Sequence, residues 1–311
     1  MADITAPLSS INEQANQDVK TLVNPPRKPI SSGKVLTYVL LGFGAILAIF
    51  PFVWMVSWSL MQAWEVGLGR LVPQELQFEN YREAWTEANF SQFMRNSAIL
   101  SAISISGMLT LCIPAAYAFA KMRFYGKNVL FVLMVSTLMI PDIVTLIPNF
   151  LTVTWISRFS ESIFGEAGRW MNNWPSLTIP FMASAFTIFL LRQFFMQIPD
   201  DLWDAARIDG AGHLRYMVSV VLPLSRAPLM TVITLSFIGS WNSLLWPLLV
   251  VQTDDWRPVA FGLKQLAQDE YPGDYHLQMA ASVIMILPIL VIYFIAQKQF
   301  TEGIASSGLK G

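Results

Sequence analysis

The chain has 311 residues, of which 54% are hydrophobic and only 13% are charged. This composition is too apolar for an ordinary soluble domain of the same length, so a membrane protein is the default class. The net charge of −1 gives no basic excess for binding nucleic acid. One cysteine and two histidines are too few for a disulfide framework or a metal site built from these residues.

The chain begins with a polar segment, residues 1–33, which contains the sequence NPPRKP near its end. It lacks the apolar centre and the small-residue cleavage site of a signal peptide. We expect it to be a flexible cytoplasmic tail. A membrane domain over residues 34–300 and a second cytoplasmic tail over residues 301–311 should follow it.

Six apolar stretches are long enough to cross the hydrocarbon core, which takes roughly 20 helical residues for about 30 Å. They are residues 35–60, 94–120, 128–155, 177–197, 221–250 and 278–299. Prolines and glycines interrupt several of them, and such breaks are tolerated only where protein or a cavity covers the freed backbone groups. The sequence therefore predicts an all-α protein with six transmembrane helices around a pathway.

The placement of Lys and Arg predicts the orientation of these helices. Seven of the 20 basic residues lie on the segments expected outside the cell: Arg70, Arg82, Arg95, Arg158, Arg169, Arg257 and Lys264. The other thirteen lie on the inner segments, which favours both termini in the cytoplasm. The outer segments 61–93 and 251–277 carry acidic and aromatic residues. We expect them to contact an external partner, although solvated loops would have a similar composition.

Pro141 and Asp142 interrupt the third stretch in its outer half. An ionisable side chain at that depth indicates a solute pathway. A carboxylate at a helix break can also simply face the outer water. Asn149, which follows Pro148, is a weaker candidate for the same role.

A polar segment, residues 199–223, lies on the cytoplasmic side between the fourth and fifth stretches. Pro199, followed by two aspartates, favours the start of a helix there. Gly210 favours a reversal of the chain after that helix, and a second short helix should run to Pro223, where the next span opens. An amphipathic helix pair on the membrane surface would explain these features without any partner.

The order of residues in this segment carries a resemblance to a known family. The family pattern E-A-A-x₃-G-x₉-I-x-L-P is matched by Asp204, Ala205, Ala206, Gly210, Val220, Leu222 and Pro223. The chain resembles the permease subunits of bacterial ATP-driven (ABC) importers, in particular the carbohydrate branch of the maltose and glycerol-phosphate type. The stretches AAYAFAKMRF, LMIPDIVTLIPNF, FIGSWNSLLWPLLV and the final GLKG are also similar to that branch. The two departures, Asp204 for Glu and Val220 for Ile, keep the charge and the shape.

The resemblance covers residues 35–311, with a core permease module at about 92–298. It implies the type I ABC importer permease fold and a polar segment that docks in a groove of a cytoplasmic ATPase. The residues implied in this coupling are Asp204, Ala205, Ala206, Arg207, Asp209, Gly210 and Pro223. It also implies three kinds of partner: a second permease, two ATPase subunits and an extracytoplasmic solute-binding protein. The chain contains no G-x-x-x-x-G-K-[ST] phosphate loop, so magnesium and ATP should be bound by the ATPases and the chain itself should need no cofactor.

A cluster in the fifth stretch offers further candidates for solute contact: Gly239, Ser240, Trp241, Asn242 and Ser243. Trp241 can cover the apolar face of a sugar, and Asn242 can bond sugar hydroxyls. Both residue types are equally common in the packing between spans, where small neighbours such as Gly239 and Ser240 help helices to approach.

The expected function is that of a non-catalytic permease subunit of a sugar importer in the bacterial inner membrane. An importer for glycerol 3-phosphate or another solute would have the same features. A transporter driven by an ion gradient is an alternative of another class, but inverted repeats and paired intramembrane carboxylates are expected there, and only Asp142 comes near. An intramembrane enzyme is excluded because no nucleophile and base set lies in the spans.

Overall fold

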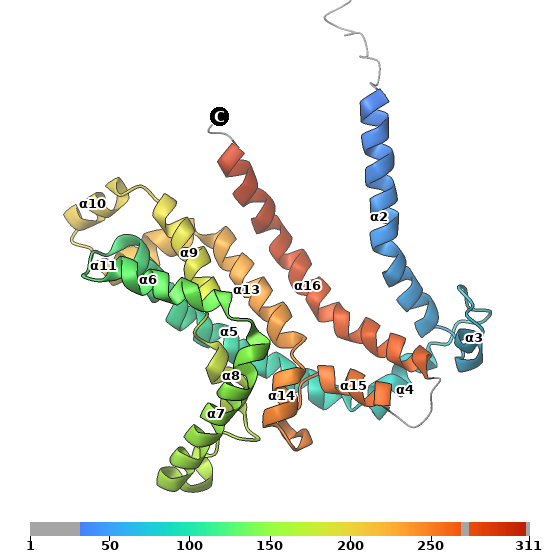
Figure 1. Ribbon diagram of the computed structural model, residues 1–311. Coiled ribbons are helices and arrows are strands. Elements are labelled where there is room, and N and C mark those ends of the chain that lie inside the picture. The colour runs from blue at the N-terminus through green and yellow to red at the C-terminus, as the bar shows by residue number, and fades with distance from the viewer. Residues whose placement is uncertain (1–31, 269–273, 309–311) are drawn as a thin grey trace, which may run out of the picture. The chain divides into compact units, whose positions relative to one another are not determined.

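The computed structural model describes the backbone of residues 32–268 and 274–308 (Figure 1). Within these ranges every regular element is a helix, which confirms the all-α prediction. The chain divides into two compact units, residues 1–53 and 54–311, and each unit is described by itself. Most of the N-terminal tail expected at residues 1–33 lies outside the described residues.

The first unit contains the greater part of helix α2 (Ser32–Ser59). Its residues 33–53 are all exposed, including the large apolar side chains. The segment Gly33–Ser59 has a mean hydropathy of 2.4, and none of its most apolar window is buried within the protein. Because so much apolar surface is not tolerated in water, lipid or a partner must cover this helix.

The second unit holds the remaining helices. They are α3 (Ala63–Gly67), α4 (Glu79–Glu87), α5 (Phe90–Lys121), α6 (Lys127–Ser136), η1 (Thr137–Met139), α7 (Asp142–Phe164), η2 (Gly165–Gly168), α8 (Trp174–Thr178), η3 (Ile179–Phe181), α9 (Ala185–Gln197), α10 (Asp201–Ile208), α11 (His213–Tyr216), the π-helix η4 (Met217–Val221), α12 (Leu222–Leu224), α13 (Arg226–Trp241), α14 (Leu245–Val250), η5 (Asp254–Trp256), α15 (Ala260–Gln268) and α16 (Tyr275–Gly308). The backbone of α16 stays helical to Gly308, so most of the segment expected as a C-terminal tail continues the last helix.

Three helices, α2, α5 and α16, are long and apolar enough to cross a membrane. Three further passages are pairs of helices joined at a bend. The angles are 105° between Lys127–Met139 and Asp142–Gly168, 41° between Trp174–Phe181 and Ala185–Gln197, and 82° between His213–Leu224 and Arg226–Trp241. The prediction of six spans is therefore met only if each bent pair is counted as one span.

The 105° bend lies inside the third predicted span, 128–155, so the prediction of one kinked span there was too simple. Ile140 and Pro141 both have extended backbones, with ψ of 119° and 136°. A residue that precedes proline is pushed out of the helical region, which explains why the helix stops before Pro141. Helix α7 then begins anew at Asp142 and runs to Phe164.

The fifth predicted span, 221–250, was wrong at both ends. Pro223 does not open it, because this proline lies inside a run that is helical from His213 to Leu224, directly after the π-helix η4. The direction changes at Ser225, with φ −106° and ψ 26°, and α13 begins at the next residue. At the other end α13 stops at Trp241, and α14 is a separate short helix.

Helix α5 is central to the packing of the second unit, where it contacts α9 and α13 (Figure 1). Its buried residues recur every three or four positions along one face, among them Ser97, Leu100, Met108, Cys112 and Ala116. Its N-terminal end joins a core shared with α4, α13, α15 and α16. Its C-terminal half packs with α9 and with residues 216–221. One helix thus reaches from one end of this unit to the other.

Candidate functional site

The first candidate site is the polar helix pair, here defined as residues 199–224. Its first arm is α10, and Figure 1 shows α10 and α11 at the same end of α9. Gly210 adopts φ 74°, the left-handed conformation expected from the sequence. Ala211 N–H donates to the Ala206 carbonyl at 2.8 Å, and Gly210 N–H donates to the Arg207 carbonyl at 3.0 Å. These two hydrogen bonds form a Schellman motif, which fixes the direction in which the chain leaves the first arm.

The second arm consists of α11, η4 and α12, and it ends at the 82° turn into α13. Gly212 precedes it with an extended backbone, φ −81° and ψ 172°. Tyr216, Met217 and Val221 are buried against the second half of α5 and against α9. One face of the second arm is therefore anchored in the membrane domain.

Four aromatic rings join the two arms to each other and to α5. The imidazole of His213 stacks on the Trp203 indole, with ring centroids 4.3 Å apart and planes 14° apart. The Trp203 ring also meets Tyr216 edge-on at 5.1 Å. Tyr117 of α5 completes the group, because its hydroxyl lies 2.8 Å from His213 Nδ1. We call these four residues the aromatic clamp; it ties both arms to the end of the central helix.

A lysine makes a second connection between α5 and the first arm. Lys121 Nζ donates to the Ile198 carbonyl at 2.6 Å and to Asp200 Oδ1 at 2.7 Å. The Lys121 side chain is only 8% exposed, whereas that of Asp200 is 82% exposed. The hydrogen bond and the positive charge of Lys121 lower the pKa of Asp200 below its ordinary value.

This ion pair should be insensitive to pH in the physiological range. Because the pKa of Asp200 is lowered in the folded chain, the stabilisation is present above the ordinary aspartate pKa, about 4. It is lost only as the pH falls through the lowered value. We expect Asp200→Asn to reduce solute uptake by the same factor, roughly fivefold or less, at pH 5.5 and at pH 8. Uptake in proteoliposomes at both values checks this, and a factor that changes between them would contradict the assignment.

The remaining surface of the polar helix pair is exposed and mixed in character. Asp204, Ala205, Arg207, Asp209 and Pro223 are exposed, whereas Ala206 is half-buried against the second-arm core. Two large apolar side chains also face outward, Ile208 at 88% and Leu214 at 72% exposure. A pair that carries both exposed apolar residues and charges is suited to a protein partner.

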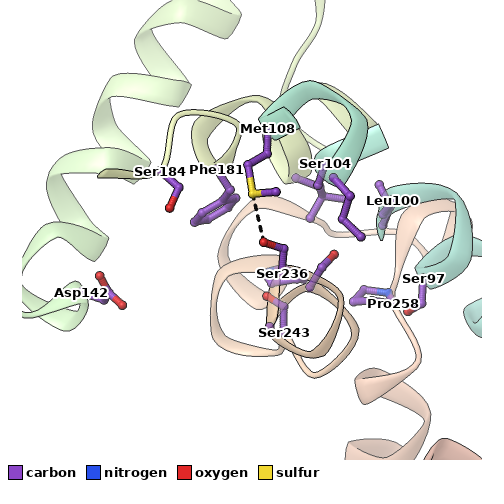
Figure 2. A pocket seen from close by; sticks show the side chains of 15 residues that line it. Ser97, Leu100, Ser104, Met108, Asp142, Phe181, Ser184, Ser236, Ser243 and Pro258 are labelled. Carbon is purple, nitrogen blue, oxygen red and sulfur yellow. Dashed lines mark hydrogen bonds between the residues drawn. The ribbon is translucent and has the colours of Figure 1, made fainter. Parts of the chain in front are cut away.

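The second candidate site is a cavity of about 360 Å³ in the second unit. It is lined by Ser97, Leu100, Ser104, Ile105, Met108, Asp142, Leu177, Phe181, Ser184, Ser236, Gly239, Ser240, Ser243, Pro247 and Pro258. Figure 2 shows Asp142 on the side of the cavity away from Ser97 and Pro258. Six of the lining residues are serines, so the cavity offers hydroxyl groups beside an aromatic ring and aliphatic side chains.

Of the pathway candidates predicted from the sequence, the cavity includes Asp142 and three members of the cluster in the fifth stretch, Gly239, Ser240 and Ser243. Asn149 and Asn242 are exposed and do not line it. Trp241 is 3% exposed; its indole N–H donates to the Met285 carbonyl at 3.0 Å and its ring stacks on Phe237. That arrangement matches the packing alternative for Trp241.

Four of the six cavity serines, Ser97, Ser104, Ser184 and Ser236, were not recognised in the sequence, although a signal was present. Ser97 and Ser104 are seven residues apart on α5, and Ser236 and Ser240 are four apart on α13. These spacings place each pair on one face of its helix. Two serine-bearing faces on neighbouring spans would have indicated a hydroxyl-lined cavity.

Comparisons with known proteins show the family of the chain. The family model described as "Binding-protein-dependent transport system inner membrane component" matches residues 112–305. The sn-glycerol-3-phosphate transport system permease protein UgpE of Pectobacterium atrosepticum is 32% identical over 283 residues, with 88% of this chain and 96% of the relative covered. The protein of the same name from Escherichia coli O157:H7 is 32% identical over 282 residues, with the same coverage.

Solved structures are similar as well. A chain of a bacterial ABC transporter involved in the import of the acidic polysaccharide alginate matches with a TM-score of 0.76 and 25% identity, over 88% of this chain and 99% of that one. A chain of the bacterial alginate ABC transporter in complex with an alginate pentasaccharide-bound periplasmic protein matches with a TM-score of 0.59 and 15% identity, over 84% and 92%. The second likeness concerns the fold alone.

Proposed function

Because the chain belongs to the family of binding-protein-dependent transport system inner membrane components, we propose that it forms one half of the translocation pathway of a sugar importer. It is a permease subunit of the bacterial inner membrane with the type I ABC permease fold. The other half of the pathway comes from a second, similar permease. Counting each bent passage as one crossing gives six spans and places both termini in the cytoplasm. In the passage His213–Leu224 + Arg226–Trp241 the crossing part is α13, and the second arm stays on the cytoplasmic side.

The polar helix pair couples this permease to a cytoplasmic ATPase. The observation that carries this proposal is its attachment to α5 through the aromatic clamp and Lys121, while Ile208 and Leu214 stay exposed. The same helix lines the cavity between Ser97 and Met108. A displacement of the docked pair therefore reaches the cavity through one continuous helix. The same helix pair also exposes the charged residues Asp204, Arg207 and Asp209. Their charges favour one orientation of the pair on the ATPase.

ATP hydrolysis belongs to two partner ATPase subunits, which bind the nucleotide and its magnesium ion. This chain contributes no phosphate loop and needs no cofactor of its own. Its role is mechanical: closure of the ATPases on nucleotide moves the polar helix pair, and the spans exchange between inward-open and outward-open arrangements. A transporter driven by an ion gradient does not fit the family to which the chain belongs.

An extracytoplasmic binding protein delivers the solute to the opposite face. The described part of the outer segment after α14 is held rigidly, because Asn96 Nδ2 donates to the carbonyls of Asp255 at 2.9 Å and Arg257 at 3.0 Å. Helix α4 carries the exposed, charged Glu79 beside this region of the core. A fixed, polar surface of this kind is suited to receive a soluble protein.

Site-specific crosslinking in the complete complex tests both docking surfaces at once. We expect a cysteine at Ile208 to crosslink to the ATPase and a cysteine at Glu79 to crosslink to the binding protein. Each position serves as the control for the other, since neither should react with the opposite partner. Crosslinks from Ile208→Cys to the binding protein, or none to the ATPase during turnover, would contradict the proposed orientation and coupling.

A further inference from the structure

The side chains that line the cavity carry one negative charge and no positive charge. Asp142 is the single ionisable residue among the fifteen that line it, and no Lys, Arg or His takes part in the lining (Figure 2). Within the described part of the chain, no ion pair includes Asp142. An anion that entered this space would therefore meet one negative charge and no positive charge from this chain.

The basic residue next to the lining in sequence is already engaged. Arg257 precedes Pro258, but its guanidinium bonds the Asp254 carboxylate and donates to the Gln252 carbonyl at 3.2 Å. It also lies over the Phe261 ring, 5.1 Å from the centroid. These contacts hold its charge on the outer segment, where Asp254 neutralises it.

Most hydroxyl groups of the cavity remain able to donate to a solute; Ser236 is the exception, because its Oγ donates to Met108 Sδ at 3.0 Å (Figure 2). No hydrogen bond within the described residues uses the side chains of Ser104 and Ser243, which are half-buried. Ser97 Oγ accepts from Val259 N–H at 2.7 Å and Ser184 Oγ accepts from Thr187 N–H at 3.2 Å, so both keep their own proton free to donate. The lining thus pairs hydroxyl donors with apolar surfaces from Phe181 and Leu100, which suits the mixed faces of a sugar or polyol.

We propose that this cavity is a selectivity site that admits uncharged, hydroxyl-rich solutes and disfavours phosphorylated or carboxylated ones through Asp142. The inference rests on the proposed transport function and deepens it. The solutes named for relatives and structural neighbours, sn-glycerol 3-phosphate and the acidic polysaccharide alginate, are anionic, so the proposal expects a solute of another charge class for this chain. Asp142 is exposed at the side of the cavity, and its carboxylate repels a second negative charge that enters the space. The lining offers no basic side chain to offset that repulsion, whereas an uncharged solute does not experience it.

The charge of the cavity can be measured without knowing the solute, by labelling a single cysteine with thiol reagents of opposite charge. Ser243→Cys places a thiol in the lining, in a chain where Cys112→Ser removes the only native cysteine, which is buried. The probes are the trimethylammonium-ethyl and sulfonatoethyl methanethiosulfonates. They are applied to the full complex in proteoliposomes, and each rate is divided by that with a free thiol in solution. We expect the cationic reagent to be favoured, and Asp142→Asn to reduce this preference on the order of tenfold.

Two further positions make the result specific. Gly239→Cys is a second cavity position, since a Cβ there meets no atom within 4 Å and the helix can keep its conformation. Asn242→Cys is exposed outside the lining and should show a preference that Asp142→Asn leaves unchanged. Equal rates for the two reagents, or a preference independent of Asp142, would overturn the proposal. Failure of both cavity cysteines to react would overturn it too, because solutes could not reach the site.

The result of the cysteine labelling does not depend on the result of the crosslinking that tests the proposed function. Labelling reports the potential in the cavity and requires no coupling to ATP hydrolysis. Crosslinking at Ile208 reports docking of the polar helix pair and does not depend on the charge of the cavity. A cationic preference without ATPase crosslinks would therefore leave the selectivity site in place and reject the coupling proposal, whereas the opposite pair of results would reject only the selectivity site.

Discussion

Replacing Gly210 by leucine should abolish most solute uptake while ATP hydrolysis continues. Gly210 has φ 74°, and a Cβ built there meets no atom within 4 Å, so the penalty comes from the backbone conformation and not from a collision. The left-handed conformation costs a residue with a side chain about 1–2 kcal/mol. To escape it the chain would give up the Schellman bonds to Ala206 and Arg207, and the second arm would leave the first at another angle. Uptake and ATPase activity measured side by side in proteoliposomes give the coupling ratio.

Two matched variants separate conformation from bulk. Gly212→Leu adds the same side chain two residues later, where the backbone is extended and the space around the Cβ is also open. It should retain most of the uptake. Gly210→Asn should recover part of the coupling, because asparagine tolerates the left-handed conformation better than leucine. If Gly210→Leu transports as well as the unmodified protein, the polar helix pair is not the coupling element.

Loss of the His213 side chain should be the second most damaging change. His213→Ala removes both the hydrogen bond to Tyr117 at 2.8 Å and the stack on Trp203 at 4.3 Å. Each interaction is worth about 0.5–1.5 kcal/mol. The hydrogen bond joins the second arm to α5 and the stack joins the two arms, so their joint loss should disfavour the observed arrangement of the clamp by roughly 5- to 150-fold. We expect solute transported per ATP hydrolysed to fall accordingly, because the docked arms would move without drawing α5 with them.

Two single variants separate the contributions of the hydrogen bond and of the ring stack to the coupling ratio. Tyr117→Phe removes only the hydrogen bond, and His213→Asn can keep that bond while it loses the stack on Trp203. Each should lie between the unmodified chain and His213→Ala in its coupling ratio. Combining Tyr117→Phe with His213→Ala should cost little more than His213→Ala alone, since the two residues act through one contact. Strictly additive losses would show that Tyr117 works independently of the clamp.

The sequence predicted the parts of the site that depend on neighbours along the chain. The helix pair and the left-handed Gly210 follow from residues within a stretch of about 25, because caps and turns are local structures. The aromatic clamp could not be predicted in this way. Tyr117 and His213 are 96 positions apart, and nothing in their spacing shows that α5 and the second arm meet.

The cavity illustrates the same limit. Asp142 was predicted as a pathway residue from its depth and its neighbouring proline, and the structure places it in the lining. Trp241 was proposed from side-chain chemistry alone, yet its indole is buried against α16. The side chains of α13 pack into grooves on α5 and α16, and this packing decides which face of α13 is buried and which is open. The buried face therefore depends on all three helices. The bend at Ser225 was missed because Pro223, a stronger breaking signal, is accommodated within the helical run that follows the π-helix η4.

The bare surface of α2 has a consequence for how the protein is made. Its 27-residue apolar segment is about 40 Å long at 1.5 Å per residue, which exceeds the hydrocarbon thickness of about 30 Å. The helix must tilt or extend into the headgroups to match the bilayer. None of the most apolar window of α2 is buried by the rest of the chain. The helix can therefore enter the bilayer as soon as it leaves the ribosome. Helix α2 therefore reaches the translocon as a self-sufficient anchor before the bent helices that follow it in the chain.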